Sequence, residues 1–514
     1  MPDTPAWVRD AVFYQVFPDR FAASERVAKP GPLEAWDAPP TNDGFKGGDL
    51  LGIVEHLDHI AGLGVNALYL TPVFQSASNH RYHTYDYLAV DPLLGGDAAL
   101  RELLDAAHAR DMRVILDGVF NHTGRGFWPF HHVLETGGSS PYRHWFHFDQ
   151  AGLDHHKPID AYPMGRLRAG MPLDEPWPGT ADVDAASARV RLGYDAWWGM
   201  PALPKLNTAE PAVREYLMGV AEHWLGFGID GWRLDVPAEI DDPSFWQEFR
   251  QRCRAVNPDA YLVGEIWHVA PDWVSGDRFD ALMNYPLAEA IIGFVGGRSL
   301  NEQLLRSHHE YAQVTRLDAP AFAVALAELL SAYAPETAAV QLNLLGSHDT
   351  PRVLSLLGGD VDAMELAVLL QGTLPGAPCV YYGDEVGLTG GKDPDSRKAF
   401  PWDRARWEAD LLDATRATFT LRRAEPALRA DGVSVLGAAG AALAFERRSG
   451  DRRLAVAINA GDGTASLDLG PADGPASVLL STGRARISPA RLGELEGAVR
   501  VELPPRAGAV IRLA

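Results

Sequence analysis

Short apolar runs, rich in β-branched and aromatic residues, recur along the chain from about residue 12 to residue 384. Most of these runs are separated by segments in which the apolar residues have helical spacing. Strands that alternate with helices are typical of parallel pairing through crossover connections, so the pattern predicts an α/β protein. The candidate strands lie at 12–17, 65–73, 113–120, 229–236, 261–267, 280–286, 340–346 and 378–384. Eight such units at this chain length predict a (β/α)8 TIM barrel.

The helices expected between these strands lie at Leu51–Leu63, Ala98–Ala109, Val213–Phe227, Phe245–Val256, Phe322–Tyr333 and Met364–Gly372. Residues 122–205 break the rhythm, because they are rich in Gly, Pro, His and Trp and lack clear helical spacing. A loop of that length without structure is uncommon in a barrel, so we expect an inserted domain after strand three. From about residue 430, short alternating strands with Gly-rich turns predict an antiparallel β-sandwich. The predicted domains are a barrel at 1–121 and 206–428, an inserted domain at 122–205 and a C-terminal sandwich at 429–514.

Composition indicates which kinds of partner and which cellular compartment to expect. The 514 residues include 46 Lys and Arg against 68 Asp and Glu, a net charge of −22 that argues against nucleic acid or an anionic membrane as partner. Cys253 and Cys379 are too few for a disulfide framework and fit a reducing compartment. We see no signal peptide and no apolar run long enough to span a membrane, so we expect a cytoplasmic protein.

Polar side chains follow the apolar runs where four of the predicted strands end. Barrel enzymes carry their catalytic groups at these carboxyl ends. The acids there are Asp117 after strand three, Asp235 after strand four, Glu265 after strand five and Asp349 after strand seven. A single acid of this kind is as easily a salt bridge or a helix cap, but four together at one end of a barrel favour a catalytic site.

Two of these acids have neighbours that predict different protonation states. Arg233 and Asp235 lie two residues apart on a strand and share a face, so the guanidinium is expected to keep Asp235 ionised, as a nucleophile requires. Glu265 follows an apolar run and precedes Ile266 and Trp267, a setting that raises the pKa of a carboxyl group and suits a general acid. An ionised and a protonated carboxyl group that face each other are the two catalytic groups of a glycosidase.

Four motifs in the same order resemble the conserved regions of the α-amylase family, glycoside hydrolase family 13. They are DGVFNHTG at 117–124, GWRLDVPAE at 231–239, GEIW at 264–267 and LLGSHDTPR at 344–352. The resemblance covers nearly the whole chain. It implies that Asp235 is the nucleophile, Glu265 the acid/base and Asp349 the stabiliser of the transition state.

The resemblance also implies a set of residues that bind the sugar whose bond is cleaved, in subsite −1. These are Tyr82, Asp117, His122, Arg233, His348, Asp393 and Arg397. Tyr82 is implied to stack under this sugar, and Asp393 and Arg397 to bond its non-reducing end. From the residues alone, core packing of Tyr82 and a surface ion pair between Asp393 and Arg397 remain open.

A further segment, LPKLN at 203–207, is similar to the MPKLN segment of cyclomaltodextrinases, neopullulanases and maltogenic amylases. Members of that group carry an N-terminal β-domain that helps form dimers. Because the first strand begins near residue 12, we expect that domain to be absent and the protein to be a monomer. Its absence also puts a preference for cyclodextrins in doubt.

Metal and cofactor sites are not predicted. The family often has a calcium loop soon after strand one, but residues 22–26 here are Ala-Ala-Ser-Glu-Arg, and Ala and Arg supply no side-chain oxygen. The histidines between 131 and 156 lack the spacing of a compact metal-binding pair. His83 and Gly346 stand where relatives often have Asp, and the sequence assigns them no role.

The function implied is a retaining α-glucan hydrolase that uses a covalent glycosyl-enzyme. It would cleave α-1,4 bonds, with α-1,6 side activity, in maltooligosaccharides, cyclodextrins, pullulan or starch. A transglycosylase or isomerase on the same scaffold, of the glucanotransferase or trehalose-synthase type, is the first alternative, and the catalytic motifs do not separate it. A non-catalytic carbohydrate-binding member is the second, against which the three retained acids argue.

Overall fold

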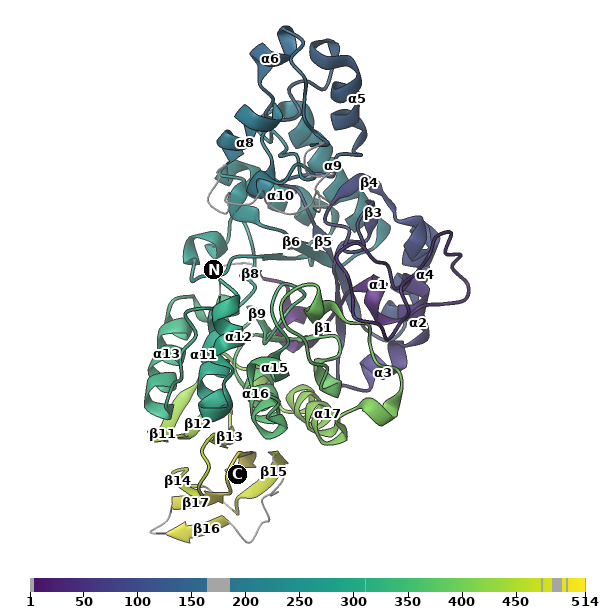
Figure 1. Cartoon of the computed structure of the whole chain (residues 1–514). Helices are drawn as coiled ribbons and strands as arrows, with labels where there is room; N and C mark the ends of the chain where they lie inside the picture. Colours follow the sequence, from purple (N-terminus) through teal and green to yellow (C-terminus); the bar gives the residue numbers. More distant parts are fainter. Residues whose placement is uncertain are drawn as a thin grey trace.

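The computed structural model describes residues 4–163, 185–309, 311–472, 475–482, 492–495 and 498–513. Within these residues, eight parallel strands form one sheet in the order β8-β7-β6-β5-β2-β1-β10-β9. They are β1 (Phe13–Val16), β2 (Ala67–Leu70), β5 (Arg113–Gly118), β6 (Gly231–Leu234), β7 (Tyr261–Gly264), β8 (Ala281–Leu282), β9 (Leu342–Leu344) and β10 (Ala377–Tyr381). A parallel bridge between Met283 and Leu342 joins the two ends of this order and closes the barrel. The predicted (β/α)8 fold is therefore confirmed (Figure 1).

The helices surround this barrel and include all six segments expected from the periodicity. They are α1 (Pro18–Phe21), α2 (Leu50–Glu55), α3 (Leu57–Ala61), α4 (Gly96–His108), α9 (Pro211–Phe227), α10 (Pro243–Val256), α11 (Tyr285–Gly296), α12 (Glu302–Ser307), α13 (Ala319–Ser331), α14 (Pro335–Ala338), α15 (Val353–Leu356), α16 (Val361–Thr373) and α17 (Ala409–Ala424). The expected helix at 51–63 is two helices, interrupted at His56. The pattern did not reveal α11, because nearly all of its residues are buried and no polar face marks its period.

The segment that follows β5 projects from one end of the barrel (Figure 1). It contains α5 (Trp128–Thr136), α6 (Gln150–Asp154) and α8 (Ala185–Leu192). Pro129 and two histidines obscure α5 in the sequence, and α6 is too short to show a helical period. A bridge from His122 to Lys205 joins its two ends, and a bridge from Phe146 to Leu206 joins its middle to the residue that follows it. Residues 164–184 of the expected inserted domain lie outside the described residues, and the limits 122–205 and 429–514 stay predictions.

The C-terminal part packs as two antiparallel sheets at the opposite end of the molecule (Figure 1). One sheet has the order β11-β12-β13-β18-β15 and the other β14-β17-β16. Their strands are β11 (Ser434–Ala439), β12 (Ala442–Ser449), β13 (Arg452–Asn459), β14 (Ala465–Asp468), β15 (Ser477–Thr482), β16 (Leu492–Leu495), β17 (Ala498–Leu503) and β18 (Ala507–Arg512). Alternate apolar residues such as Ala444, Leu467 and Ile511 form a shared core, as expected for a sandwich.

The register of the central strands brings chemically active residues together. Asp117 of β5 lies opposite Arg233 of β6, and Leu234 lies opposite Gly264 of β7. The residues that follow those two strands, Asp235 and Glu265, therefore emerge side by side at the carboxyl end of the barrel. A short hairpin of β3 (Phe74–Ser76) and β4 (Thr84–Val90) holds the loop that carries Tyr82 beside them.

None of the helices in the described part of the chain is long and apolar enough to cross a membrane.

The contact between β6 and β7 yields a test of this register. Gly231 lies opposite Tyr261, and a Cβ atom added to it would lie 2.1 Å from the Tyr261 carbonyl oxygen. Because that oxygen belongs to the backbone, Gly231→Ala should lower the free energy of unfolding by about 3 kcal/mol, measured by thermal or denaturant unfolding. Gly219→Ala in α9 is the matched control, since nothing lies within 4 Å of its added Cβ. The control should be neutral or stabilising, and a Gly231→Ala variant as stable as wild type would contradict the register.

Candidate active site

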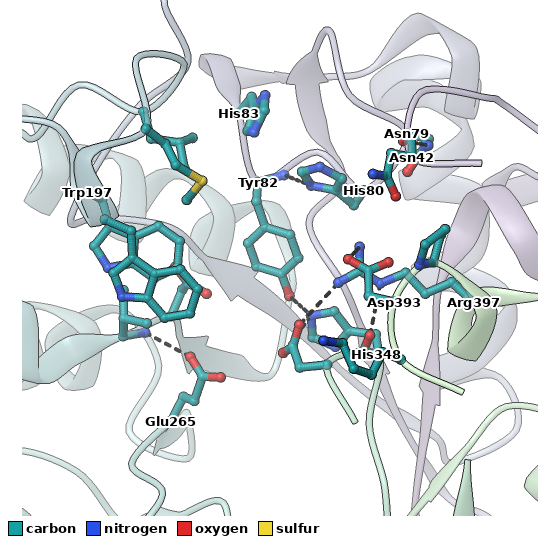
Figure 2. A pocket seen from close by; sticks show the side chains of 18 of the residues that line it. Asn42, Asn79, His80, Tyr82, His83, Trp197, Glu265, His348, Asp393 and Arg397 are labelled. Atoms are coloured by element: carbon teal, nitrogen blue, oxygen red, sulfur yellow. Dashed lines mark hydrogen bonds and ion pairs between the residues drawn. The ribbon is translucent and has the colours of Figure 1, made fainter. Parts of the chain in front are cut away.

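A pocket of about 430 Å³ opens at the carboxyl end of the barrel strands (Figure 2). Eight of the ten residues predicted for the site line it: Tyr82, His122, Asp235, Glu265, His348, Asp349, Asp393 and Arg397. The other two, Asp117 and Arg233, lie beneath its floor and bond to residues that line it. The structure thus brings together all ten side chains, which come from segments spread over more than three hundred positions of the sequence.

Arg233 lies at the centre of the acidic groups and is fully buried. Its Nη1 donates to both oxygens of Asp117, at 2.8 and 2.9 Å, and to Oδ1 of Asp235 at 2.9 Å. Its Nη2 lies 2.8 Å from Oε1 of Glu265. One guanidinium thus holds three carboxyl groups within a few ångströms of one another, a task that suits the planar fork of arginine.

The two acids proposed for catalysis use their oxygens differently. Oε2 of Glu265 accepts a hydrogen bond from the Val236 N–H at 3.0 Å. Oδ2 of Asp235 is buried and makes no hydrogen bond to the described residues, so one oxygen of this carboxyl group is left for a ligand. Val236 itself has a φ of 36°, a left-handed conformation that is strained for a β-branched residue and is typical of functional sites.

Burial dominates the protonation of these groups. It raises the pKa of Glu265 to about 7, with the charge of Asp349 adding to the effect and Arg233 opposing it. This agrees with the expectation for a general acid. Burial also raises the pKa of Asp235 well above its usual range, although Arg233 lowers it. Arg233 acts on Asp235 in the expected direction, but burial and the three neighbouring acids outweigh it, so the expectation of a low pKa for Asp235 is wrong.

Asp349 differs from its neighbours because basic side chains surround it. Burial again acts to raise its pKa, but the pKa is lowered overall by His348, Arg397 and Arg233. Nη2 of Arg397 donates to Oδ1 of Asp349 at 3.2 Å, and its Nη1 pairs with Asp393 at 3.0 Å. Asp393 and Arg397 therefore line the pocket as a connected pair, and the alternative of an isolated surface ion pair is excluded.

A chain of hydrogen bonds fixes His348 and Tyr82. The Gln15 amide of β1 donates to Nδ1 of His348 at 3.0 Å, which leaves the ring hydrogen on Nε2. Nε2 lies 2.6 Å from the Tyr82 hydroxyl and 3.1 Å from Oδ2 of Asp349. The Tyr82 hydroxyl donates to Asp117 at 2.8 Å. Burial lowers the pKa of His348 to about 3, so the ring is neutral and its tautomer decides what it can donate.

Aromatic rings that sequence reasoning missed form the wall beside Glu265. His122 stacks on Trp197 at a centroid distance of 4.9 Å, and Trp197 stacks on Trp198 at 4.6 Å. Trp198 has a φ of 51° and is 53 % exposed. Both tryptophans come just before the LPKLN segment, and their position next to that motif could have indicated that they belong to the site. Gln15 was equally visible, as the single polar residue inside an apolar strand.

The structure shows what surrounds His83 and Gly346, the two positions to which the sequence assigns no role. His83 lines the pocket near His122, and burial lowers its pKa to about 4. A Cβ atom at Gly346 would lie 3.0 Å from the Val353 side chain and 3.3 Å from the Thr350 hydroxyl. A larger residue at position 346 would therefore require these neighbours to move.

The residues after strand one do not fit the calcium ion that the family resemblance implies. The carboxylate of Asp49 accepts hydrogen bonds from the backbone N–H groups of Ser24 and Gly52. The Lys29 ammonium lies 3.0 Å from Oδ2 of Asp49 and donates to the Leu93 carbonyl oxygen at 2.6 Å. Across the residues that the structure describes, no group of three or more His, Cys, Asp or Glu side chains could hold a metal ion. The oxygen atoms at this position therefore bind the Lys29 ammonium. That the protein needs no metal stays a prediction.

Removal of metal should therefore leave the protein unchanged. We expect excess EDTA or added Ca²⁺ not to shift the thermal midpoint, whereas Lys29→Met should lower the free energy of unfolding by about 2 kcal/mol by leaving Asp49 without its cation. Lys157→Met is the control, because the Lys157 side chain is 67 % exposed beside Asp149 and such surface pairs contribute little. A midpoint that falls in EDTA would show that a metal is bound after all.

The role of Gln15 can be tested by spectroscopy. In the wild type, ¹⁵N NMR should show His348 as the neutral Nε2–H tautomer, since Gln15 donates to Nδ1. Gln15→Leu should give a mixture of tautomers, and Gln15→Glu, which presents a carboxylate acceptor, should favour Nδ1–H. If the Gln15→Leu spectrum keeps pure Nε2–H, then another group sets the tautomer.

Comparisons with known proteins agree with this geometry. The family model "Alpha amylase, catalytic domain" matches residues 15–421. A cyclomaltodextrinase from Geobacillus thermopakistaniensis is 39 % identical over 469 residues, which cover 90 % of this chain and 71 % of that protein. Neopullulanase 2 from Thermoactinomyces vulgaris is 39 % identical over 461 residues, covering 89 % and 70 %. The crystal structure of a debranching enzyme from Nostoc punctiforme matches with a TM-score of 0.84 and 45 % identity, covering 100 % of both chains.

The pocket at the barrel mouth, the acids gathered on Arg233 and the match of the family model over most of the chain lead to one conclusion. This chain belongs to the alpha-amylase family and is a glycoside hydrolase.

Proposed function

We propose that this chain is a retaining α-glucan hydrolase. Its substrates would be maltooligosaccharides, cyclodextrins, pullulan or starch, cleaved at α-1,4 bonds with α-1,6 side activity. The observation that carries the proposal is the pair Asp235 and Glu265 on one guanidinium, with Oδ2 of Asp235 free of hydrogen bonds to the described residues and the pKa of Glu265 near 7. Acids this close favour the spacing of retaining enzymes, about 5–5.5 Å, over the wider spacing of inverting ones.

The first half of the reaction forms a covalent intermediate. Glu265 gives its proton to the glycosidic oxygen as the bond to the anomeric carbon breaks, and Oδ2 of Asp235 attacks that carbon from the other side. While Glu265 holds its proton, one repelling anion beside Asp235 is neutralised. Arg233 Nη1 can then hold Asp235 as a carboxylate. Asp349, whose pKa is lowered, supports the positive charge that develops on the sugar.

The second half returns the enzyme to its starting state. Glu265, now a carboxylate, takes a proton from a water molecule, whose oxygen attacks the anomeric carbon. The ester bond to Asp235 breaks, and two inversions give a product with the α configuration of the substrate.

The names of two relatives support the substrate class. A cyclomaltodextrinase and a neopullulanase are similar to this chain over most of its length, and their names refer to cyclomaltodextrin and pullulan, which are both α-glucans. The chain is proposed to act without a metal, which the ammonium beside Asp49 supports. The monomeric state and cytoplasmic location expected from the sequence stay predictions.

Transglycosylation is the second candidate function. The stacked rings of Trp197 and Trp198 line the pocket and offer apolar faces of the kind on which sugars pack. A sugar held there could replace water in the second step and receive the glycosyl group. The products of maltotriose cleavage distinguish the two functions, since transfer gives oligosaccharides longer than the substrate.

The acid/base assignment predicts a split between substrates. Glu265→Gln should lower kcat on maltotriose by about 10³-fold, and much less on α-maltosyl fluoride, because fluoride leaves without a proton. Asp235→Ala should abolish turnover of both. For the wild type, kcat/KM on maltotriose should fall as pH rises through about 7, since Glu265 must be protonated to act as the acid.

Product stereochemistry gives the decisive readout. ¹H NMR of the wild-type reaction should show the α-anomer first. An initial β-anomer, or an Asp235→Ala variant with a near wild-type rate, would refute the retaining mechanism. The absence of hydrolysis of maltotriose, β-cyclodextrin and starch would refute the proposed function itself.

A further inference from the structure

The 390–397 loop, which follows β10, carries two residues of the pocket, Asp393 and Arg397. Arg397 reaches the catalytic groups directly, because its Nη2 donates to Asp349 at 3.2 Å and its Nε donates to the His348 carbonyl oxygen at 2.8 Å. Figure 2 shows Asp393, Arg397 and His348 together on one side of the pocket. Loops are usually more mobile than the elements that they connect, so these two side chains need support from elsewhere in the fold.

Arg352, the last residue of the fourth motif, contacts both ends of this loop. Its backbone N–H donates to the Gly390 carbonyl oxygen at 3.1 Å, and its side-chain Nε donates to the Ser396 carbonyl oxygen at 2.8 Å. The Ser396 carbonyl oxygen belongs to the peptide group that joins Ser396 to Arg397. The hydrogen bond from Arg352 therefore fixes the backbone from which the Arg397 side chain extends.

The rest of the Arg352 guanidinium is anchored at the carboxyl end of β10. Its Nη1 donates to the Tyr382 carbonyl oxygen at 2.5 Å and to Oδ1 of Asp384 at 2.9 Å. The Tyr381 ring covers the guanidinium, with its centroid 3.9 Å from Cζ. Arg352 is 1 % exposed, and a buried charge is costly unless such partners are in place. Since the partners on the strand and on the loop are satisfied together in this arrangement, the guanidinium favours a single position of the loop.

A second buried arginine, Arg422 of α17, lies at the other end of the same strand. It is also 1 % exposed, and it donates to the carbonyl oxygens of Leu374 at 3.1 Å and Gly376 at 2.5 Å, just before β10 begins. Barrel enzymes have their active sites at the carboxyl ends of the strands, whereas the opposite end contributes to stability. The two arginines are therefore alike in burial and in bonding to carbonyl oxygens, but only Arg352 holds a loop that carries residues of the pocket.

We propose that Arg352 is a positioning residue, which holds the 390–397 loop so that Asp393 and Arg397 meet the non-reducing end of the sugar attacked by Asp235. An arginine suits this task because its planar fork donates through Nε and Nη1 to partners on two different segments, whereas a lysine ammonium is a single point of charge. This inference rests on the proposed function and deepens it. It makes recognition of the sugar depend on a residue that does not line the pocket.

Removal of one hydroxyl group from the substrate tests this role. 4-Nitrophenyl α-glucoside carries a 4-hydroxyl group at its non-reducing end, and its 4-deoxy analogue lacks this group. In the wild type, kcat/KM should be about ten- to a hundredfold lower on the deoxy analogue, the effect of lost hydrogen bonds to charged groups. In Arg352→Lys this penalty should shrink to about threefold or less, because the displaced pair no longer binds the hydroxyl group.

Arg422→Lys is the matched control. It removes an equally buried fork from the same strand, but at the end opposite to the pocket, so the penalty for the missing hydroxyl group should stay at the wild-type value. If Arg352→Lys does not fold, Asp384→Asn takes its place, because it removes the charge of an acid that pairs with Arg352. The penalty should then shrink in the same direction but by less.

Three outcomes would overturn the proposal. An unchanged penalty in the folded Arg352→Lys or Asp384→Asn variant would mean that the loop keeps its position without this contact. An equal reduction in Arg422→Lys would mean that both arginines act only through general stability. A wild type that loses nothing on the deoxy analogue would mean that Asp393 and Arg397 do not bind this end of the sugar.

Hydrogen exchange separates this inference from the proposed reaction, because it requires no turnover. Mass spectrometry should show that the backbone amides of residues 390–397 exchange about tenfold faster in Arg352→Lys than in the wild type, and at the wild-type rate in Arg422→Lys. Unchanged exchange in Arg352→Lys would refute the inference even if hydrolysis is confirmed. If the wild type hydrolyses no glucoside or glucan but exchange rises as expected, the proposed function fails and the positioning of the loop by Arg352 stands.

Discussion

The guanidinium of Arg233 lies among three carboxyl groups at the mouth of the barrel, and the arrangement of the pocket depends on this contact. Pairing of β5, β6 and β7 delivers Asp117, Asp235 and Glu265 to the same point, where their mutual repulsion would otherwise force them apart. One positive charge cannot balance three buried acids, so the site retains a proton near neutral pH. Too little positive charge destabilises the ionised form of these acids. For the same reason one acid stays protonated, as the cleavage of a glycosidic bond requires.

The two walls of the pocket have different chemistry. The wall beside Glu265 carries stacked rings from the segment inserted after β5, and the opposite wall carries amide and charged groups from the loops after β1 and β10. Aromatic faces tolerate many sugar orientations, whereas hydrogen-bonding groups require specific hydroxyl positions. The scaffold can therefore be selective on one side of the cleaved bond and permissive on the other, with both properties set by loops.

Most of the fold was predictable, because each barrel strand is an apolar run and each motif acid follows one. The helices that were not predicted lack a clear pattern of apolar and polar positions. α11 is apolar on every side, and α5 contains a proline and two histidines that interrupt the pattern. All ten predicted site residues gather at one place, yet the protonation of Asp235 could not be foreseen. Its pKa depends on how many acids share Arg233 and on how deeply they are buried, which are properties of tertiary structure. The contact of Arg352 with the loop after β10 was equally hidden, because only the folded chain brings the two together.

Lys29 gives the loop after β1 a cation that belongs to the polypeptide itself. The stabilisation provided by a dissociable ion grows with its concentration in the surroundings and vanishes on dilution. A tethered ammonium has no such dependence, since its effective concentration is set by the length of the chain that carries it. The predicted independence from metal would then follow from covalent linkage, because the cation is present at the loop as soon as the chain has folded.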